Sequence, residues 1–343
     1  STKNMTRASI AKWSLTAVAS FVVFVGLLKS VFSPRSLRTM TVGNRITPNE
    51  HGPCDTLREP SVFRAMTNKK ASFASNCDLS QGLAFGTRCD LRRGYTFFTF
   101  DPEQDEHVSH GMIETGGLYD AHVHVALDHA LHILKRYSLS CDLRDSVVLD
   151  VGSNLGTLAL YASALGCRTH AFEIQPSVIC RLEMSMLASN LDIQLHRKAV
   201  HSESGKIFSF GSSPTNPGGV GITKAVSAGE EPTEVESVRL DDMFFEAQSQ
   251  ILFMKVDTEG NEFEVLKSAE KLLAEKRIKY MVIEVRPSQT EMVNFLYSHG
   301  YWCTLIRAAR SRSDVACRKT EASQVLSELE AVEHFSDMFC CFD

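Results

Sequence analysis

A ten-residue stretch at 147–156 limits the folds open to this chain more than any other part of its sequence. It reads Val-Val-Leu-Asp-Val-Gly-Ser-Asn-Leu-Gly, an apolar run that leads into an acidic residue and two glycines four positions apart. The β-branched run suits a parallel strand that is covered on both faces. Gly152 permits a sharp turn, and Gly156 begins a helix whose free backbone amides face a ligand. We therefore predict a strand, a ligand-binding turn and a helix at 156–165.

A second acidic residue indicates which kind of ligand the turn binds. About twenty residues later, the sequence His-Ala-Phe-Glu at 170–173 reads as a short strand that ends in Glu173. From that position a carboxylate can accept hydrogen bonds from both hydroxyls of a ribose. A dinucleotide site would require G-x-G-x-x-G, but Ser153 and Asn154 occupy the loop where the central glycine would stand. The pattern predicts a nucleoside site, and an ordinary strand, turn and helix is the alternative.

Two motifs in this chain resemble those of a known family. The residues from Asp150 to Gly156 read D-x-G-x-x-x-G, which resembles motif I of class I S-adenosylmethionine (SAM) methyltransferases. The residues from Lys255 to Glu262 read Lys-Val-Asp-Thr-Glu-Gly-Asn-Glu and closely resemble the K-x-D-x-E-G-x-E signature of FkbM-type methyltransferases. Further segments that are similar to the same family lie at 100–117, 238–242 and 281–285. The resemblance extends from about Phe97 to the C-terminus.

The resemblance implies a Rossmann-like α/β fold, with a mostly parallel sheet whose last strand is antiparallel, and SAM as the cofactor. It places five residues at the cofactor, namely Asp150, Gly152, Asn154, Gly156 and Glu173. The catalytic candidates are the three acids Asp257, Glu259 and Glu262, and Glu284 ends a neighbouring strand. A hydroxyl is a poor nucleophile, so a base must take its proton during methyl transfer. Asp257 is the first candidate for that base or for positioning the substrate; helix capping is the alternative, above all for Glu262.

The N-terminal segment differs in charge from the rest of the chain. It has seven Lys or Arg residues and no acidic residue before Glu50, so its net charge is +7. The net charge of the whole chain is −5, and the remainder therefore has a net charge of −12. Residues 13–28 are uncharged and mostly apolar, and Val31 and Phe32 extend the run past Lys29. About twenty such residues can cross a bilayer if Lys29 extends its amine to the interface. We predict a signal anchor, with a transit peptide or a cleaved signal peptide as alternatives.

The predicted organisation has four parts. These are a basic tail and membrane anchor at 1–32, a stem at 33–94, a cap at 95–145 and a SAM-dependent methyltransferase domain at 146–343. Apolar residues in the stem show no long period of 2 or 3.6 residues. In the methyltransferase domain, a loop at 212–236 is expected to fold over the substrate. Charges on the two sides of the anchor nearly balance, but the short N-terminal tail favours a lumenal catalytic domain in the Golgi or endoplasmic reticulum. Delivery to an organelle by a transit peptide is the alternative.

Ten cysteines suit an oxidising compartment. Disulfides are expected among the cysteines of the stem and the pair at 340–341, whereas Cys167 and Cys180 are expected to be buried thiols. The absence of a C-x-x-C pair excludes the usual structural zinc site. His122 and His124 fall on a predicted helix, where side chains two positions apart diverge, so no metal site is predicted.

The acidic balance argues against nucleic acid as a partner, because nucleic-acid-binding domains usually present a basic face. We expect a membrane-anchored, SAM-dependent O-methyltransferase whose partner is a hydroxyl-bearing substrate, most simply a sugar of a glycan. A small-molecule or lipid hydroxyl is the alternative acceptor. His110 and Tyr119 are candidate substrate-side groups, and ordinary hydrogen-bonded surface residues are the alternative for both. A non-catalytic, membrane-tethered binding protein on the same fold is the alternative from a different class.

Overall fold

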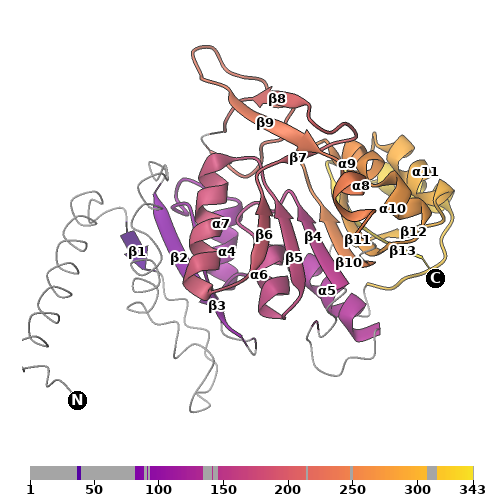
Figure 1. Cartoon of the computed structure of the whole chain (residues 1–343), viewed down its shortest axis with the longest axis horizontal. Helices are drawn as coiled ribbons and strands as arrows, with labels where there is room; N and C mark the ends of the chain where they lie inside the picture. The colour runs from indigo at the N-terminus through magenta and orange to yellow at the C-terminus, as the bar shows by residue number, and fades with distance from the viewer. Residues whose placement is uncertain are drawn as a thin grey trace, which may run out of the picture.

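The computed structural model describes residues 37–39, 82–88, 91, 93–133, 141, 146–213, 215–247, 250–306 and 315–342. Its central element is a seven-stranded sheet with the strand order β12-β13-β11-β10-β4-β5-β6 (Figure 1). The strands are β4 Ser146–Val151, β5 Arg168–Phe172, β6 Ile193–His196, β10 Gln250–Val256, β11 Ile278–Val285, β12 Trp302–Leu305 and β13 Ser336–Cys341.

Strand direction in this sheet agrees with the sequence prediction. Strands β11, β10, β4, β5 and β6 pair in parallel, and β13 runs antiparallel between β11 and β12. This mostly parallel order with an antiparallel last strand is the predicted Rossmann-like sheet. Strand β6 ends at His196, and the next strand, Ala199–Val200 (β7), pairs with a different sheet.

Apolar residues cover both faces of the sheet because successive side chains of each strand point to opposite sides. On β10, Phe253 packs into one apolar cluster and Met254 into the other. The first cluster receives α4 Val108–Thr115, α5 Ala121–Ile133, α6 Thr157–Ala164 and α7 Pro176–Ser189. The second receives α8 Leu240–Phe244, α9 Glu262–Ser268, α10 Glu270–Ala274, α11 Thr290–Ser298 and α12 Ala322–Glu330.

The end of the predicted stem contains a strand. Residues Leu83–Arg88 (β2) pair antiparallel with Tyr95–Thr99 (β3) and parallel with Leu37–Thr39 (β1). Strand β3 lies along α7, where the backbone amide of Phe98 donates to Ser185 Oγ at 2.8 Å. Strand β2 is only partly buried, so its sequence lacks the clear alternation that identifies a strand.

A smaller sheet lies beyond the end of the main sheet (Figure 1). In it, Thr233–Val238 (β9) pairs antiparallel with Ile207–Phe210 (β8) and parallel with β7. The sequence analysis assigned the whole of 212–236 to a loop, but β9 begins at Thr233 and the loop therefore ends at residue 232.

The predicted membrane anchor at 13–32 lies outside the residues that the structure describes. Within the described ranges, no helix combines the length and the apolar character needed to cross a bilayer.

Disulfides join cysteines that the sequence analysis treated differently. The described pairs are Cys141–Cys167, Cys303–Cys340 and Cys317–Cys341. Cys180 is also disulfide-bonded. The prediction that Cys167 and Cys180 are buried thiols was therefore wrong; both positions are buried, as expected, but their sulfurs are bonded.

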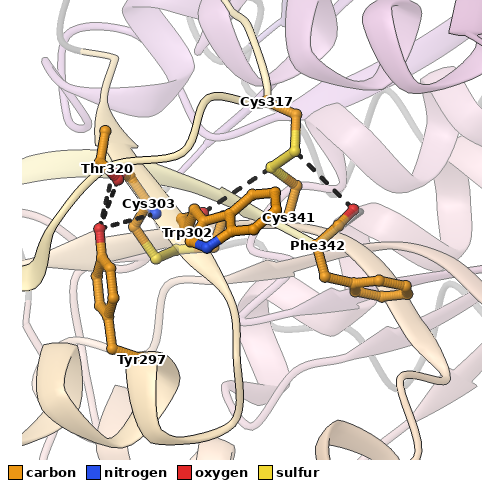
Figure 2. The surroundings of a disulfide bond; sticks show 8 residues. Tyr297, Trp302, Cys303, Cys317, Thr320, Cys341 and Phe342 are labelled. Carbon is orange, nitrogen blue, oxygen red and sulfur yellow. Dashed lines mark hydrogen bonds between the residues drawn. A yellow bond between two sulfur atoms is a disulfide. The ribbon is translucent and has the colours of Figure 1, made fainter.

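The adjacent cysteines at the end of β13 form two disulfides because neighbouring side chains of a strand point to opposite faces. Cys340 bonds to Cys303, its partner in the strand register, and Cys341 bonds to Cys317. Figure 2 shows the second disulfide beside Trp302. In the same region Thr320 Oγ1 donates to the carbonyl of Cys303 at 2.9 Å, which ties the segment after β12 to that strand.

We expect the double variant Cys303→Ala/Cys340→Ala to unfold at a lower denaturant concentration than the wild type. The disulfide closes a loop of 37 residues, and such links contribute about 2–4 kcal/mol by restricting the unfolded chain. Chemical denaturation followed by circular dichroism measures the loss. An unchanged midpoint would show that this link adds nothing to stability.

Candidate active site

Two cavities open at the carboxyl ends of the parallel strands, where ligands bind in sheets of this kind. The smaller has a volume of about 60 Å³ and is lined by Gly152, Glu173 and Val200, among others. The larger has a volume of about 300 Å³ and lies between the ends of β10 and β11 and the start of α5. Three residues line both cavities, namely Asn154, Asp257 and Glu259.

The turn after β4 is shaped by its contact with the turn after β10. Gly152 has φ 76°, and a Cβ atom added to it would lie 1.7 Å from the carbonyl oxygen of Asp257. The glycine is therefore required by the approach of another strand end, rather than only by a ligand as the sequence suggested. Gly156, with φ 81°, is the N-cap of α6.

Glu173, at the end of β5, holds the turn after β4 in place. Its Oε2 accepts from the backbone amide of Asn154 at 2.8 Å, and its Oε1 accepts from the amides of Ile174 and Gln175 at 2.7 and 2.9 Å. Burial raises the pKa of Glu173, while these amides act against the rise. A carboxylate offers about four acceptor positions, so Glu173 has room for one ribose hydroxyl on Oε2 rather than for two.

Asp150 does not line either cavity. It is fully buried, and its Oδ2 accepts from the backbone amide of Ala159 in the first turn of α6 at 2.9 Å. Its Oδ1 has no hydrogen-bond partner among the described residues, and burial raises its pKa. Asp150 therefore stabilises the turn through its bond to α6 and does not contact either cavity.

Lys255 is a site residue that the sequence analysis did not single out. Its buried Nζ donates to Asp257 Oδ2 at 2.9 Å and to the carbonyl oxygen of Gly152 at 3.3 Å. Burial lowers the pKa of Lys255, but the carboxylates of Asp257, Asp150 and Asp120 outweigh burial and raise it above its ordinary value. The lysine therefore remains charged. The sequence signal for Lys255 was its place as the first residue of the signature at 255–262.

Glu262 has a structural role in the turn after β10. It is fully buried, its Oε1 accepts from the backbone amides of Thr258 and Gly260 at 2.9 Å each, and its Oε2 accepts from Gln289 Nε2 at 3.1 Å. It lines neither cavity. Glu262 therefore holds the turn before α9 together, and it makes no bond to the free amides at the start of that helix, which the capping alternative required.

Glu259 and Glu284 share one arginine on the wall of the larger cavity. Arg286 donates to Glu259 at 3.3 Å and to Glu284 at 3.1 Å. Burial and the nearby carboxylate of Asp257 raise the pKa of Glu284 to about 8, although Arg286 opposes the rise. The acid that ends β11 thus belongs to the same site as Asp257, as its position at a strand end indicated.

The opposite wall comes from the segment between α4 and α5. Tyr119 and Asp120 line the larger cavity there, and burial together with Asp120 raises the pKa of Tyr119 to about 12. His122, on the same side, lies 2.8 Å from Asp337. His110 instead forms an exposed ion pair with Glu114, outside both cavities.

The two histidines of α5 face different neighbours. His122 contacts Asp337, whereas the buried His124 bonds through Nε2 to the carbonyl oxygen of Thr157. Among the residues described, no group of three or more His, Cys, Asp or Glu side chains is arranged to hold a metal ion.

The loop at 212–232 covers the smaller cavity. Val220 and Ile222 line that cavity, and Gly218 lies so close that a Cβ atom there would be 2.1 Å from Asn154 Nδ2. Ligand pockets usually have volumes of about 300–1,000 Å³, so a cavity of about 60 Å³ does not admit a nucleoside cofactor in this conformation. The covering loop must therefore move when such a cofactor enters.

The residues around the smaller cavity fit SAM. Val200 and Ile222 offer apolar surface to an adenine ring, and Glu173 retains acceptor capacity for a ribose hydroxyl. Asn154 and Asp257, where the two cavities meet, are placed to face the reactive part of the cofactor.

The chain is similar to one family model and to several solved structures. Residues 150–312 match the model of the methyltransferase FkbM domain. A precorrin-6y C5,15-methyltransferase from Geobacter metallireducens GS-15 is similar at 14% identity and a TM-score of 0.33, over 66% of this chain and 88% of that chain. A 16S rRNA N2 G1207 methyltransferase from T. Thermophilus is similar at 13% identity and a TM-score of 0.37, over 76% of this chain and 51% of that chain. No curated protein matches the chain.

We expect Glu173→Ala to weaken SAM binding by about 1.5–3 kcal/mol, the contribution of a hydrogen bond to a charged group. The variant also removes the acceptor of three backbone amides, so its free energy of unfolding should fall by about 1–3 kcal/mol. Calorimetric titration with SAM and chemical denaturation measure the two effects, with the exposed Glu234→Ala as a control. A folded Glu173→Ala variant with wild-type SAM affinity would contradict the assignment of the smaller cavity to the nucleoside.

Proposed function

Because this chain carries an FkbM-type, SAM-dependent methyltransferase domain, we propose that it transfers the methyl group of SAM to a hydroxyl of a sugar. The observation that carries the proposal is the junction of the two cavities at Asn154, Asp257 and Glu259. With the nucleoside in the smaller cavity, Asn154, Asp257 and Glu259 would hold the reactive end of SAM at this junction, beside the larger cavity. The acceptor therefore occupies the larger cavity.

The wall of the larger cavity supports a polyhydroxyl acceptor. Its volume of about 300 Å³ lies at the lower end of the range for small-molecule pockets. Carboxylates, a lysine, an arginine and a tyrosine hydroxyl line it, and these groups bind hydroxyls through hydrogen bonds in both directions. The exposed ring of Phe335 at the same cavity offers an apolar surface to the face of a sugar ring.

Methyl transfer requires position and exclusion of water more than covalent help from the protein. When bound, SAM supplies an electrophilic methyl group on a sulfonium ion. The chain's own residues hold the acceptor oxygen in line with that methyl group, and the loop at 212–232 keeps water out. Asp257 and Glu259, at the junction, are placed for contact with the acceptor, whereas Glu262 supports the turn from within.

Disulfide bonds support a lumenal location in the secretory pathway. Three pairs are described, and such bonds persist in oxidising compartments and are rare in the cytosol. The apolar run at 13–32 supplies the proposed anchor, so the acceptor would be a glycan that the catalytic domain meets in the lumen of the Golgi or endoplasmic reticulum. A lipid hydroxyl is the second candidate, because an anchored domain works beside a membrane.

We expect the purified protein to transfer a labelled methyl group from SAM to neutral glycosides. Glycosides of the same anomeric form whose hydroxyls are all blocked should stay unmodified. Scintillation counting of the separated products, from a panel of methyl glycosides, glycolipids and small-molecule alcohols, measures the transfer. Transfer only to lipid or small-molecule alcohols would overturn the proposal of a sugar acceptor. Tight SAM binding without transfer to any acceptor would favour the non-catalytic alternative.

We expect the full chain to remain with membranes after carbonate extraction, because residues 13–32 would span the bilayer. In sealed microsomes the catalytic domain should resist added protease and should become sensitive when detergent opens the vesicles. Recovery of a soluble protein with a shortened N-terminus would support the transit peptide or the cleaved signal peptide instead.

A further inference from the structure

Asp120 differs from the other carboxylates of the larger cavity in making no side-chain hydrogen bond or ion pair with the part of the chain that the structure describes. Each of the others faces a cationic or ionisable side chain: Asp257 faces Lys255, Glu259 and Glu284 face Arg286, and Asp337 faces His122. The Asp120 carboxylate makes no hydrogen bond or ion pair with any residue that the structure describes. Its oxygens are therefore available to a ligand in the cavity that it lines.

The backbone at Asp120 is held in an uncommon conformation. Five non-glycine residues have positive φ among those described, and two of them, Asn190 and Lys276, follow the ends of helices. The other three are Asp120, Asn154 and Glu259, and all three line the larger cavity. Such conformations persist only where the surrounding structure imposes them, and they cluster at functional sites.

Packing imposes the conformation of this turn. The ring of Tyr119 lies against α4, where a Cβ atom added to Gly111 would be 2.4 Å from Tyr119 Cδ2. On the other side, the backbone amide of Val123 donates to the carbonyl oxygen of Asp120 at 2.9 Å. The turn is thus fixed between two helices, and the Asp120 carboxylate is directed by rigid neighbours rather than by a mobile loop.

Charges around Asp120 adjust its proton affinity. Burial raises the pKa of Asp120 to about 6; Lys255 and His122 oppose the rise, and Asp257 and Asp337 add to it. A general base is most effective when its pKa lies close to the working pH. Asp257, by contrast, already accepts a hydrogen bond from Lys255 at 2.9 Å, so one of its oxygens is occupied.

We propose that Asp120 is the general base of the methyl transfer and that Asp257, held by Lys255, positions the acceptor. This assignment rests on the proposed function, and Asp120 lies outside the residues that match the family model. The acceptor oxygen bonds to the methyl carbon while its proton moves to an Asp120 carboxylate oxygen. The carbon–sulfur bond breaks with its electron pair on sulfur, so the products are a methyl ether, S-adenosylhomocysteine and protonated Asp120, which then releases its proton to water.

The test compares Asp120→Asn with wild type, using whichever acceptor of the panel the wild type methylates. Asparagine tolerates positive φ and keeps the shape of the side chain. We expect kcat to fall by about 10²-fold or more, SAM affinity to stay within about twofold by calorimetry, and the acidic limb of the pH–rate profile, centred near pH 6, to disappear. The exposed Asp192→Asn serves as the control, because it lies outside both cavities and should change none of these values.

A second readout does not depend on turnover. Because the folded-state pKa of Asp120 is raised to about 6, folded protein keeps a proton that unfolded protein loses between about pH 4 and pH 6, and this group lowers stability as pH rises through that window. Asp120→Asn should therefore have a higher thermal midpoint than wild type at pH 7.5, and the difference should vanish near pH 4. A lower midpoint at pH 7.5 would assign Asp120 a structural role and overturn the proposal.

Asp257→Asn separates the two roles. A positioning residue should raise the KM for the acceptor more than it lowers kcat, and the acidic limb near pH 6 should remain. Loss of that limb in Asp257→Asn with its retention in Asp120→Asn would exchange the two assignments. If the wild type methylates only a lipid or small-molecule hydroxyl, the sugar proposal fails and the Asp120 assignment is still decided by these variants; if it methylates no hydroxyl at all, both fail.

Discussion

The buried ammonium of Lys255 connects the parts on which the site depends. It bonds to the carbonyl oxygen of Gly152 and to the carboxylate of Asp257, so one charge links the turns that follow β4 and β10. A buried charge is costly without partners, and both turns must stay in place to compensate it. The close approach of Gly152 to Asp257, which excludes any side chain at position 152, follows from the same junction.

The two cavities are shaped by this junction and by the elements that rest on it. Glu173 fixes the turn after β4 through the amide of Asn154, and Glu262 fixes the turn after β10 through the amides of Thr258 and Gly260. The loop at 212–232 then packs on both turns. Carboxylates that look alike in the sequence therefore divide into those that build the turns and those that face the cavities.

The sequence predicted the features that depend on local pattern. The apolar run at 147–151, its glycine turn and the acid that ends β5 all follow from strand periodicity and from the rule that ligands bind at the carboxyl ends of parallel strands. The resemblance to FkbM-type proteins then implied that the last strand is antiparallel, as β13 is. Glu284 joined the site for the same reason, since it ends the strand beside Asp257.

Features that depend on tertiary contact could not be predicted in this way. Asp120 can bind a ligand because the other carboxylates of the cavity form the ion pairs with the nearby cations. Its backbone conformation depends on how Tyr119 packs against α4. The Cys303–Cys340 disulfide depends on the register of β12 with β13, which no spacing of cysteines specifies. Strand β2 is too exposed to show a period, so it was assigned to the stem.

The position of β13 has a consequence for the order of events during synthesis. This strand comes from residues 336–341 yet lies between β11 and β12, so β12 cannot join the sheet until residues 336–341 have been made. Cys303 and Cys317 cannot form their native disulfides before that point, because their partners Cys340 and Cys341 lie on β13. Folding that proceeds from the N-terminus during synthesis therefore cannot complete this edge of the sheet before β13 has been made. Completion of this edge of the sheet and formation of its two disulfides therefore both depend on β13.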